Sequence, residues 1–320
     1  MTNSIESKPE RGGARRRDAL KCMAWAGAGI LWTVSGGVPR SLGLIGDAKA
    51  ADVPTGGLTF VQISDTHFGF KGEANPDVPG TVRRAVEMIN ALPTRPAFVV
   101  HTGDITHLSK PQEFDDAAQL LNEIKIDRIH YIPGEHDMLD DGPAGYLKRY
   151  GADKNGNGWF SFDHGGVHVV GLINVVDFKP KGLGVLGDEQ LEWLEKDVAN
   201  LSASTPVIVL AHMPLWSVYP EWGWGTDDAG RALGSLKRFG SVTVLNGHIH
   251  QIVQKVEGNV AFHTAMSTAF PQPKGGMGDG PGPLKVPAGE LGKLLGIRAV
   301  TWVPGNKQLA TIDMPLDRAG

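Results

Sequence analysis

Carboxylates and imidazoles recur along this chain in short groups that each follow a run of apolar residues. The side chains concerned are Asp65, His67, Asp104, Glu135, His136, His212, His248 and His250. Neutral imidazole and carboxylate oxygen, without sulfur, are ligands that suit Zn, Mn or Fe. Seven or eight such groups are too many for one ion, whereas two ions can share one bridging carboxylate. Because two neighbouring metal ions clamp the attacking and leaving oxygens of a displacement at phosphorus, this set of residues indicates hydrolysis of a phosphate ester.

The apolar runs before these groups have the length and composition of β-strands. "LTFVQIS" precedes Asp65, "AFVVHTG" precedes Asp104 and "PVIVLA" precedes His212. Apolar residues recur at helical spacing in residues 79–92, 111–124, 188–200 and 227–239. Strands that alternate with helices predict a layered α/β architecture, in which ligands bind beyond the carboxyl ends of the strands. We therefore expect the strands to deliver their polar residues to one place.

Other stretches are typical of antiparallel hairpins. Residues 158–174, 251–266 and 298–314 each contain two short β-rich runs around a turn with glycine. We expect these hairpins to form a second, mostly antiparallel sheet packed on the first. Residues 271–290 are rich in Gly and Pro and therefore predict a long loop or a flap.

Five short motifs occur in order along the chain. They are DTH at 65–67, GD at 103–104, GEHD at 134–137, AHMP at 211–214 and GHIH at 247–250. Over about 190 residues, this series resembles the calcineurin-like metallophosphoesterases. The resemblance implies an α/β fold, a four-layer α/β/β/α sandwich of two mixed β-sheets flanked by helices. It also implies a dinuclear centre of transition-metal ions (Fe, Mn or Zn, or a ferric ion with a divalent ion) that hydrolyses phosphodiesters or phosphomonoesters.

The resemblance further implies a role for each motif residue. One metal would be held by Asp65, His67 and His250, the other by His212, His248 and residue 135, with Asp104 as the bridge. His136 would lie above the metals and either donate a proton to the leaving oxygen or steady the phosphoryl group. Asp137 would orient the His136 ring.

Glu135 stands where the family has asparagine. A carboxylate can coordinate as an amide oxygen does, but it adds one negative charge and one methylene. Ligation through a shifted backbone, ligation through water and a weakened second site are three alternatives. The alternative function is accordingly a metal-binding protein of the same fold with weak or no catalysis.

The N-terminal 50 residues have the layout of a cleaved export signal, which leaves residues 51–320 as the metallophosphoesterase domain. Arginines at 11 and 15–17 precede an apolar stretch over residues 22–34, and small residues follow at Ala48 and Ala50. "RRDALK" at 16–21 resembles the twin-arginine export motif. We expect a periplasmic or extracellular protein that meets the twin-arginine translocation machinery during export and has no stable membrane anchor, because the apolar stretch is too short.

Net charge and cysteine content exclude some partners and some kinds of site. Residues 1–50 hold 8 of the 31 Lys and Arg and 4 of the 35 Asp and Glu, so the remainder carries 23 basic and 31 acidic residues, a net charge of −8. This balance argues against a nucleic-acid partner. The single cysteine, Cys22, lies in the export signal, so residues 51–320 form neither a disulfide nor a thiolate site.

The stretch "LWSVYPEWGWG" at 215–225 is rich in aromatic residues. It either covers a sheet edge or forms a wall that stacks on the substrate. No cluster of arginines accompanies it, which favours a small phosphoester with one reacting phosphate as the partner molecule. His107 lies close enough to Asp104 in sequence to reach the rim of the site. His101, His130, His168 and His263 lie inside predicted strands, where packed or solvated histidines are more common than ligands.

Overall fold

The structure, a computed structural model, describes residues 32–35, 38–41, 57–151, 156–177, 179–287, 289–306 and 309–317. The chain divides into two units, Met1–Ala51 and Asp52–Gly320. In the first unit, β1 (Trp32–Ser35) pairs antiparallel with β2 (Val38–Ser41). The rest of the predicted export signal lies outside the described residues. Within the described ranges, no helix is long and apolar enough to cross a membrane.

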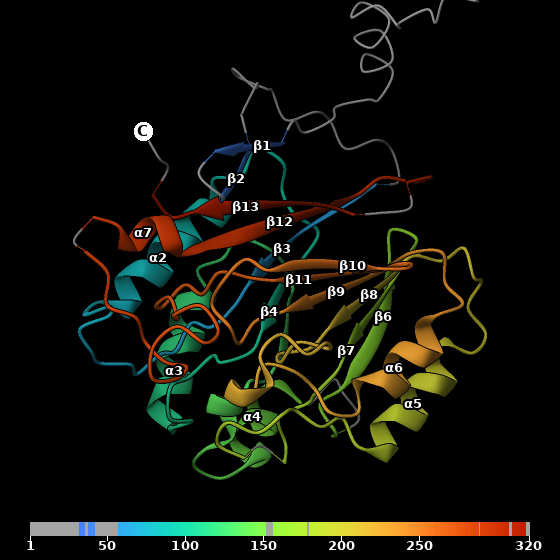
Figure 1. The fold of residues 1–320 in the computed structure, drawn as a ribbon, viewed down its shortest axis with the longest axis horizontal. Coiled ribbons are helices and arrows are strands. Elements are labelled where there is room, and N and C mark those ends of the chain that lie inside the picture. The colour runs from blue at the N-terminus through green and yellow to red at the C-terminus, as the bar shows by residue number, and fades with distance from the viewer. Residues whose placement is uncertain are drawn as a thin grey trace, which may run out of the picture. The chain divides into compact units, whose positions relative to one another are not determined.

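Two mixed β-sheets form the centre of the second unit (Figure 1). The five-stranded sheet contains β3 (Leu58–Ile63), β4 (Val99–Thr102), β5 (Ile129–Ile132), β12 (Gly296–Trp302) and β13 (Ala310–Pro315), in the order β13-β12-β3-β4-β5. The six-stranded sheet contains β6 (Phe160–His164), β7 (Val167–Gly171), β8 (Val207–Leu210), β9 (Val242–Asn246), β10 (Gln254–Glu257) and β11 (Val260–Thr264), in the order β10-β11-β9-β8-β7-β6. Parallel pairing joins β3 to β4 to β5 in one sheet, and β7 to β8 to β9 to β11 in the other.

The three predicted hairpins form, but the prediction that they make a separate antiparallel sheet was wrong. β6–β7 and β10–β11 extend the two sides of the β8–β9 pair, whereas β12–β13 extends β3. The outer strands of a parallel core leave unpaired N–H and C=O groups, and each hairpin satisfies such an edge. The hairpins therefore divide between the two sheets and make both of them mixed.

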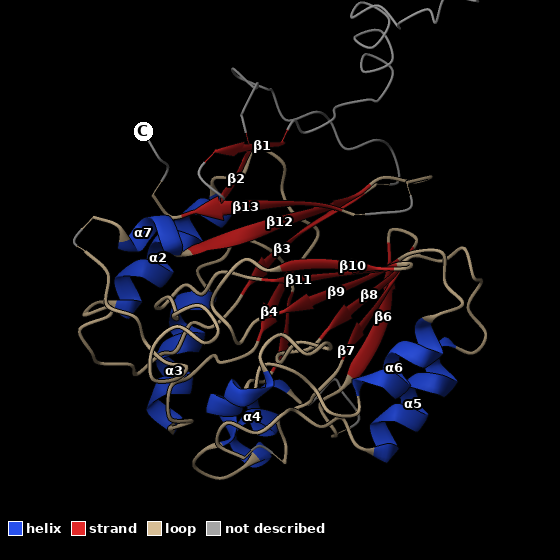
Figure 2. Ribbon diagram, in the orientation of Figure 1, coloured by secondary structure: helices blue, strands red, loops and turns tan. Residues whose placement is uncertain are grey.

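Helices flank both sheets (Figure 2). They are α2 (Val78–Asn90), α3 (Pro111–Leu121), α4 (Pro143–Tyr150), α5 (Asp188–Val198), α6 (Ala229–Leu236) and α7 (Leu291–Leu294), with the short 3-10 turns η1 (Glu135–Met138) and η2 (Pro220–Trp222). α2, α3, α5 and α6 occupy the regions where helical spacing predicted them. α4 was not predicted. Residues 271–290 contain no helix or strand among their described positions, as predicted.

Three hydrophobic cores show the layers. Side chains alternate along each strand, so in β8 Val207 and Val209 face α5 and α6, whereas Ile208 and Leu210 face the other sheet. In β3, Val61 and Ile63 pack with α2 and α3, whereas Leu58 and Phe60 enter the core between the sheets. The order helix, sheet, sheet, helix confirms the predicted four-layer α/β/β/α sandwich.

Candidate metal centre

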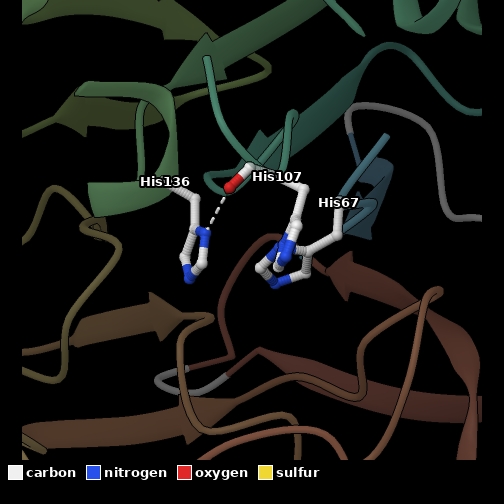
Figure 3. A group of neighbouring side chains, drawn as sticks. All are labelled: His67, His107 and His136. Atoms are coloured by element: carbon white, nitrogen blue, oxygen red, sulfur yellow. Dashed lines mark hydrogen bonds between the residues drawn. The ribbon is translucent and has the colours of Figure 1, made fainter. Parts of the chain in front are cut away.

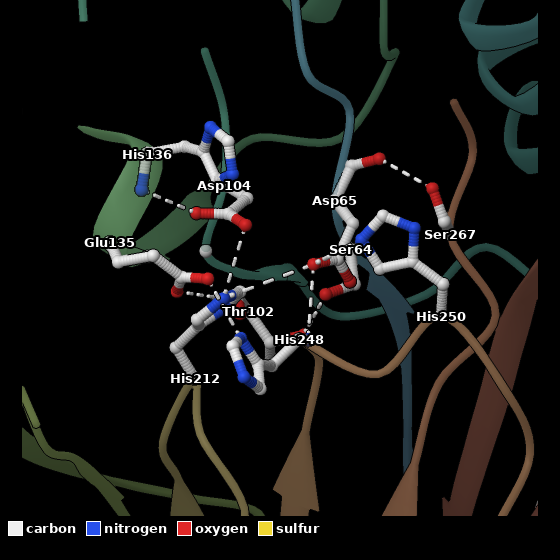
Figure 4. A network of polar contacts seen from close by, with 12 residues as sticks. Ser64, Asp65, Thr102, Asp104, Glu135, His136, His212, His248, His250 and Ser267 are labelled. Atoms are coloured by element: carbon white, nitrogen blue, oxygen red, sulfur yellow. Dashed lines mark hydrogen bonds and ion pairs between the residues drawn. The ribbon is translucent and has the colours of Figure 1, made fainter. Parts of the chain in front are cut away.

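The predicted site residues meet beyond the carboxyl ends of five strands (Figure 4). Asp65 and His67 follow β3, Asp104 follows β4, Glu135 and His136 open η1 after β5, His212 follows β8, and His248 and His250 follow β9. Figure 4 shows Asp104 and Glu135 facing His212 and His248, with Asp65 and His250 beside them. The topology therefore brings residues from both sheets to one place.

The backbone leaves these strands in an unusual conformation. Left-handed φ angles occur at Asp65 (53°), His67 (41°), Asp104 (52°), His248 (69°) and His250 (52°). This conformation costs an L-residue about 1 kcal/mol or more of free energy, because its Cβ crowds the carbonyl oxygen. The sharp turn aims each side chain inward instead of along the strand. The fold thus accepts backbone strain at five positions to gather these side chains.

Glycines in the motifs allow the loops to approach one another. A Cβ on Gly103, whose φ is 98°, would lie 2.3 Å from Nδ1 of His212. A Cβ on Gly134 would lie 2.1 Å from Oδ1 of Asp104. Only glycine fits at either position, so the glycines before Asp104 and Glu135 set the spacing of the site.

One group of donor atoms combines Asp65, His67, Asp104 and His250. Nε2 of His67 lies 3.2 Å from Nε2 of His250 and 3.5 Å from Oδ2 of Asp104, and Nε2 of His250 lies 3.3 Å from Oδ1 of Asp65. All four residues are buried. This is the ligand set that the resemblance implies for the first metal, together with the bridge.

A second group combines Glu135, His212 and His248. Oε2 of Glu135 lies 2.9 Å from Nε2 of His212, and Oε1 of Glu135 lies 2.9 Å from Nδ1 of His248. Oδ2 of Asp104 lies 3.3 Å from Nε2 of His212, so the same carboxylate oxygen faces both groups. Despite its extra methylene, Glu135 lies beside His212 and His248, the two histidines that the resemblance assigns to the second metal.

Several inward atoms of these groups have no hydrogen-bond partner among the described residues. They are Oδ2 of Asp65, Oε2 of Glu135, Nε2 of His212 and both ring nitrogens of His248. Buried polar atoms in native proteins are nearly always satisfied, because an unpaired one loses its hydration without compensation. Carboxylate oxygens and imidazole nitrogens that converge without hydrogen bonds fit a pair of transition-metal ions.

Backbone carbonyls hold the opposite edges of the imidazole rings. Nδ1 of His212 donates to the carbonyl of Thr102, and Nδ1 of His250 donates to the carbonyl of Phe270, each at 2.6 Å. Such a bond fixes the tautomer and turns Nε2 of each ring toward the centre. Sequence analysis missed both contacts, because every residue has a carbonyl and its direction depends on the fold.

His136 and His107 stack next to His67 (Figure 3). The rings of His136 and His107 are 5.0 Å apart and 17° from parallel, and Nδ1 of His107 lies 3.4 Å from Nδ1 of His67. Nδ1 of His136 donates to the His107 carbonyl at 2.6 Å, which leaves Nε2 of His136 free of that contact. His107 therefore reaches the site, and its carbonyl sets the orientation of His136.

The prediction that Asp137 orients the His136 ring was wrong. The Asp137 carboxylate accepts hydrogen bonds from the backbone N–H groups of Ile105, Thr106 and Gly134, and from the Thr106 hydroxyl. Burial and the nearby Asp104 charge raise its pKa to about 6 despite these bonds. Asp137 instead ties the loop after β4 to η1, which holds Asp104 and Glu135 next to each other.

The charges of the site shift the pKa values of its members in opposite directions. Burial lowers the pKa of His212, but the carboxylates of Asp104 and Glu135 outweigh it and hold that pKa well above the usual range. Burial raises the pKa of Glu135, but His248 and His212 outweigh it and hold that pKa well below the usual range. Burial and the adjacent imidazoles lower the pKa of His67. His67 is accordingly neutral near pH 7, the form in which imidazole binds a metal.

The other histidines lie outside the two donor groups. His101 is buried and contacts the Thr66 hydroxyl at 3.1 Å, and His130 stacks on Phe162 at 4.1 Å. His168 forms ion pairs elsewhere, and His263 lies in β11. These four strand histidines were expected to be packed or solvated, and the contacts of His101, His130 and His168 show them packed.

The aromatic stretch 215–225 is partly packed into the protein and partly exposed to a cavity. Trp224 is buried and packs with Trp222 and Ile249, and Trp216 packs against Phe262. Trp222 also lines a cavity beside Glu135 and His136. One aromatic residue of the stretch therefore reaches the site, while its neighbours stabilise the loop that carries it.

Comparison with known families identifies the domain. The model of the calcineurin-like phosphoesterase family matches residues 58–252, which is more than half of the 320 residues. The chain belongs to the calcineurin-like phosphoesterase family. This family depends on a dinuclear metal centre, and the chain is a metal-dependent phosphoesterase, a hydrolase, as predicted.

Similar curated proteins are phosphodiesterases and phosphatases. A probable glycerophosphodiester phosphodiesterase of Arcobacter nitrofigilis is 24% identical over 216 residues, which cover 66% of this chain and 78% of that protein. A probable cyclic nucleotide phosphodiesterase of Rhodococcus erythropolis is 24% identical over 234 residues, which cover 70% of this chain and 75% of that protein.

Solved structures share the fold. A dimetal phosphatase from Danio rerio superimposes with a TM-score of 0.58 at 15% identity, covering 80% of this chain and 98% of that chain. A purple acid phosphatase from yellow lupin superimposes with a TM-score of 0.57 at 15% identity, covering 81% and 52%. At this identity, the likeness shows the α/β/β/α architecture alone.

Proposed function

We propose that this chain hydrolyses small phosphodiesters or phosphomonoesters at a centre of two transition-metal ions. The observation that carries the proposal is the position of Oδ2 of Asp104, 3.5 Å from Nε2 of His67 and 3.3 Å from Nε2 of His212. One oxygen that faces two donor groups is the arrangement a bridging ligand needs. Two ions there would supply a nucleophile near neutral pH and neutralise charge on the phosphoryl group.

The protein side chains then have separate tasks. Oδ1 of Asp104 accepts the backbone N–H of His136 at 2.9 Å, which places the His136 ring over the bridge. Nδ1 of His136 is held by the His107 carbonyl, so Nε2 is the atom that can give a proton to the leaving oxygen. Burial lowers the pKa of His136, but the carboxylates of Asp104 and Glu135 outweigh it and raise that pKa, which favours the protonated form.

A metal-binding phosphoesterase with only weak catalysis is the second candidate. The observation in its favour is Glu135, whose two oxygens contact His212 and His248 at 2.9 Å each. If the carboxylate satisfies these imidazoles itself, the second metal would bind weakly. If it ligates, the centre carries three carboxylates, which favours a ferric ion with a divalent ion.

Elemental analysis combined with two chromogenic esters tests the proposal. We expect two transition-metal ions per chain and turnover of bis(p-nitrophenyl) phosphate, p-nitrophenyl phosphate or both. Fewer than two ions under a generous supply of Fe, Mn and Zn, with weak turnover, would favour the second candidate. Two bound ions without turnover of either ester, or of natural mono- and diesters, would contradict the proposed hydrolysis.

We also propose export by the twin-arginine route to the periplasm or the outside of the cell. The arginines before the apolar stretch and the small residues near Ala50 support it. Replacing Arg16 and Arg17 with lysine should leave the protein in the cytoplasmic fraction at its full length, measured by cell fractionation and mass spectrometry. Unchanged export of this variant would contradict the route.

A further inference from the structure

A cavity of about 310 Å³ opens beside the metal centre. Its lining includes Glu135, His136 and His248 of the centre, together with Lys181, Trp222 and Gln272. Glu135 and His248 are buried, whereas Lys181 is exposed. The cavity therefore leads from the metal centre to the surface and reaches it at Lys181.

The backbone of Lys181 is as unusual as that of the metal centre. Of the described residues other than glycine, seven have a left-handed φ, and five of these belong to the centre. The other two are Ser109 and Lys181, the latter with a φ of 59°. Ser109 has a local task, because its hydroxyl accepts the backbone N–H of Asp140. Strained residues persist where the surrounding structure fixes them, and they gather at functional sites.

Two other segments fix the Lys181 loop. The N–H of Gly182 donates to the Lys179 carbonyl at 2.7 Å, which closes a tight turn around Lys181. A Cβ on Gly223 would lie 2.6 Å from the Gly182 carbonyl oxygen, so the turn next to Trp222 packs directly on this loop. On the other side, the Lys181 ammonium lies 3.6 Å from the position of a Cβ on Gly280. The lysine is therefore held between the aromatic stretch and the loop 271–290.

The Lys181 ammonium has no ion-pair partner among the described residues. Lys196, Lys255, Lys285 and Lys293 each lie within 4 Å of a glutamate. Lys181, like several other described lysines, makes no such pair, although it lines the same cavity as the Glu135 carboxylate. An ammonium without a partner attracts an anion from the solvent, and the attraction grows where one side of the group faces protein.

Gln272 shows a second unsatisfied group in the cavity lining. Its Nε2 donates to the His248 carbonyl at 2.9 Å, whereas its Oε1 is buried and has no partner among the described residues. A buried acceptor is stabilised when a ligand supplies an O–H or N–H. A ligand that carries both a negative charge and a hydroxyl or amine would satisfy Lys181 and Gln272 together.

We propose that this cavity is a subsite for the organic part of the substrate, and that Lys181 binds a carboxylate or second phosphate carried by that part. The inference rests on the proposed function, since the metal centre must bind the phosphoryl group that reacts. The cavity volume of about 310 Å³ and the apolar lining by Trp222 limit the organic part to a few carbon atoms or a small ring. The substrate class is then a phosphate ester of a small, negatively charged alcohol.

Two phosphonates that resist hydrolysis test the subsite by binding. Propylphosphonate and 3-phosphonopropionate share the phosphonyl group and a similar length, but only the second carries a carboxylate. For the metal-loaded wild-type protein we expect calorimetry to show about tenfold tighter binding of 3-phosphonopropionate, and a smaller preference at high salt. Lys181→Met should abolish the preference and Lys181→Arg should retain most of it.

Lys179→Met is the matched control, because Lys179 lies in the same loop but lines a different cavity. It removes the same charge and should keep the preference. Equal binding of the two phosphonates by the wild-type protein, or loss of the preference in Lys179→Met, would overturn the subsite alone. Binding of neither phosphonate would overturn the proposed function and this inference with it. Weaker binding of both phosphonates by Lys181→Met would instead place the ammonium on the phosphonyl group and would also overturn the subsite.

Discussion

Two clusters of histidine and carboxylate in the described part of the chain differ in how many of their polar atoms form hydrogen bonds. Between β6, β7 and α5, Nδ1 of His168 donates to Asp163 at 2.8 Å and Nε2 donates to Asp197 at 2.9 Å. Ser161 donates to the second oxygen of Asp197 at 2.7 Å. Every polar atom of the His168 ring is thus paired. In the metal centre, by contrast, the inward atoms of Asp65, Glu135, His212 and His248 remain without hydrogen bonds.

The backbone shows the same difference. His168, Asp163 and Asp197 lie within β7, β6 and α5, and none of them has a left-handed φ. Five residues of the metal centre have left-handed φ angles in the loops after the strands. A cluster that stabilises the fold can form on regular elements. A cluster with a strained backbone and with polar atoms that lack hydrogen bonds is arranged for a ligand, and it lowers the stability of the fold.

Asp104→Asn is the change that should separate the two clusters most widely. Asparagine tolerates the left-handed backbone, and its amide oxygen can still accept the backbone N–H of His136, so we expect the fold to survive. It loses the charge of the oxygen that faces both donor groups. Both metals should dissociate and hydrolysis should fall below detection, measured by elemental analysis and ester turnover. Retention of two metals with normal turnover would refute the assignment of the site.

His136→Ala should reduce catalysis and spare the metals. Turnover should fall by roughly 100 to 10,000 fold, the usual range for a general acid, with a smaller loss for esters of nitrophenol. The matched control is His107→Ala, which keeps the backbone carbonyl that His136 contacts and should lose far less activity. An equal loss for good and poor leaving groups would rule out the proton-donor role.

Glu135→Asn restores the residue that the family has at this position and removes one negative charge. If Glu135 ligates the second metal, occupancy should persist and hydrolysis should stay level or rise, because the ions then polarise the phosphate more strongly. If Glu135 instead only pairs with His212 and His248, the variant should bind two ions where the wild type binds one, and activity should appear anew. Metal stoichiometry and diesterase rate under equal metal supply distinguish these results. Loss of both metal and activity would contradict both.

Sequence reasoning located the strands, the helices α2, α3, α5 and α6, and the convergence of the motif residues. These features depend on local periodicity and on the rule that ligands bind beyond strand ends. It could not assign the hairpins to their sheets, since the choice of edge depends on which strands are already neighbours. It also misjudged Asp137, whose partners are amides of another loop, and missed Lys181 and Gln272. Lone lysines and glutamines are common on surfaces, so only the fold distinguishes these two.

His168→Asn should have the smallest effect, and it should change stability alone. Burial lowers the pKa of His168, but the hydrogen bonds to Asp197 and Asp163 outweigh it and raise that pKa above the ordinary value. A raised folded-state pKa means that the ion pairs stabilise the fold fully below the unfolded-state pKa of about 6.5 and that this contribution is lost as the pH rises through the folded-state value.

The variant should therefore be less stable than the wild type by about 1 kcal/mol near pH 5.5, a modest value because Asp163 is exposed. The difference should shrink as the pH rises through the folded-state pKa of His168. Denaturant unfolding of both proteins at and above this pH measures the difference in their free energies of unfolding. Any pH dependence of metal binding that the two proteins share cancels in this difference. Turnover and metal content should match the wild type, because the His168 cluster lies outside the two donor groups. A stability difference that grows with pH would mean that His168 is neutral in the folded protein. Loss of metal in this variant would mean that the two clusters are coupled through the sheet, and that a paired histidine here also serves the centre.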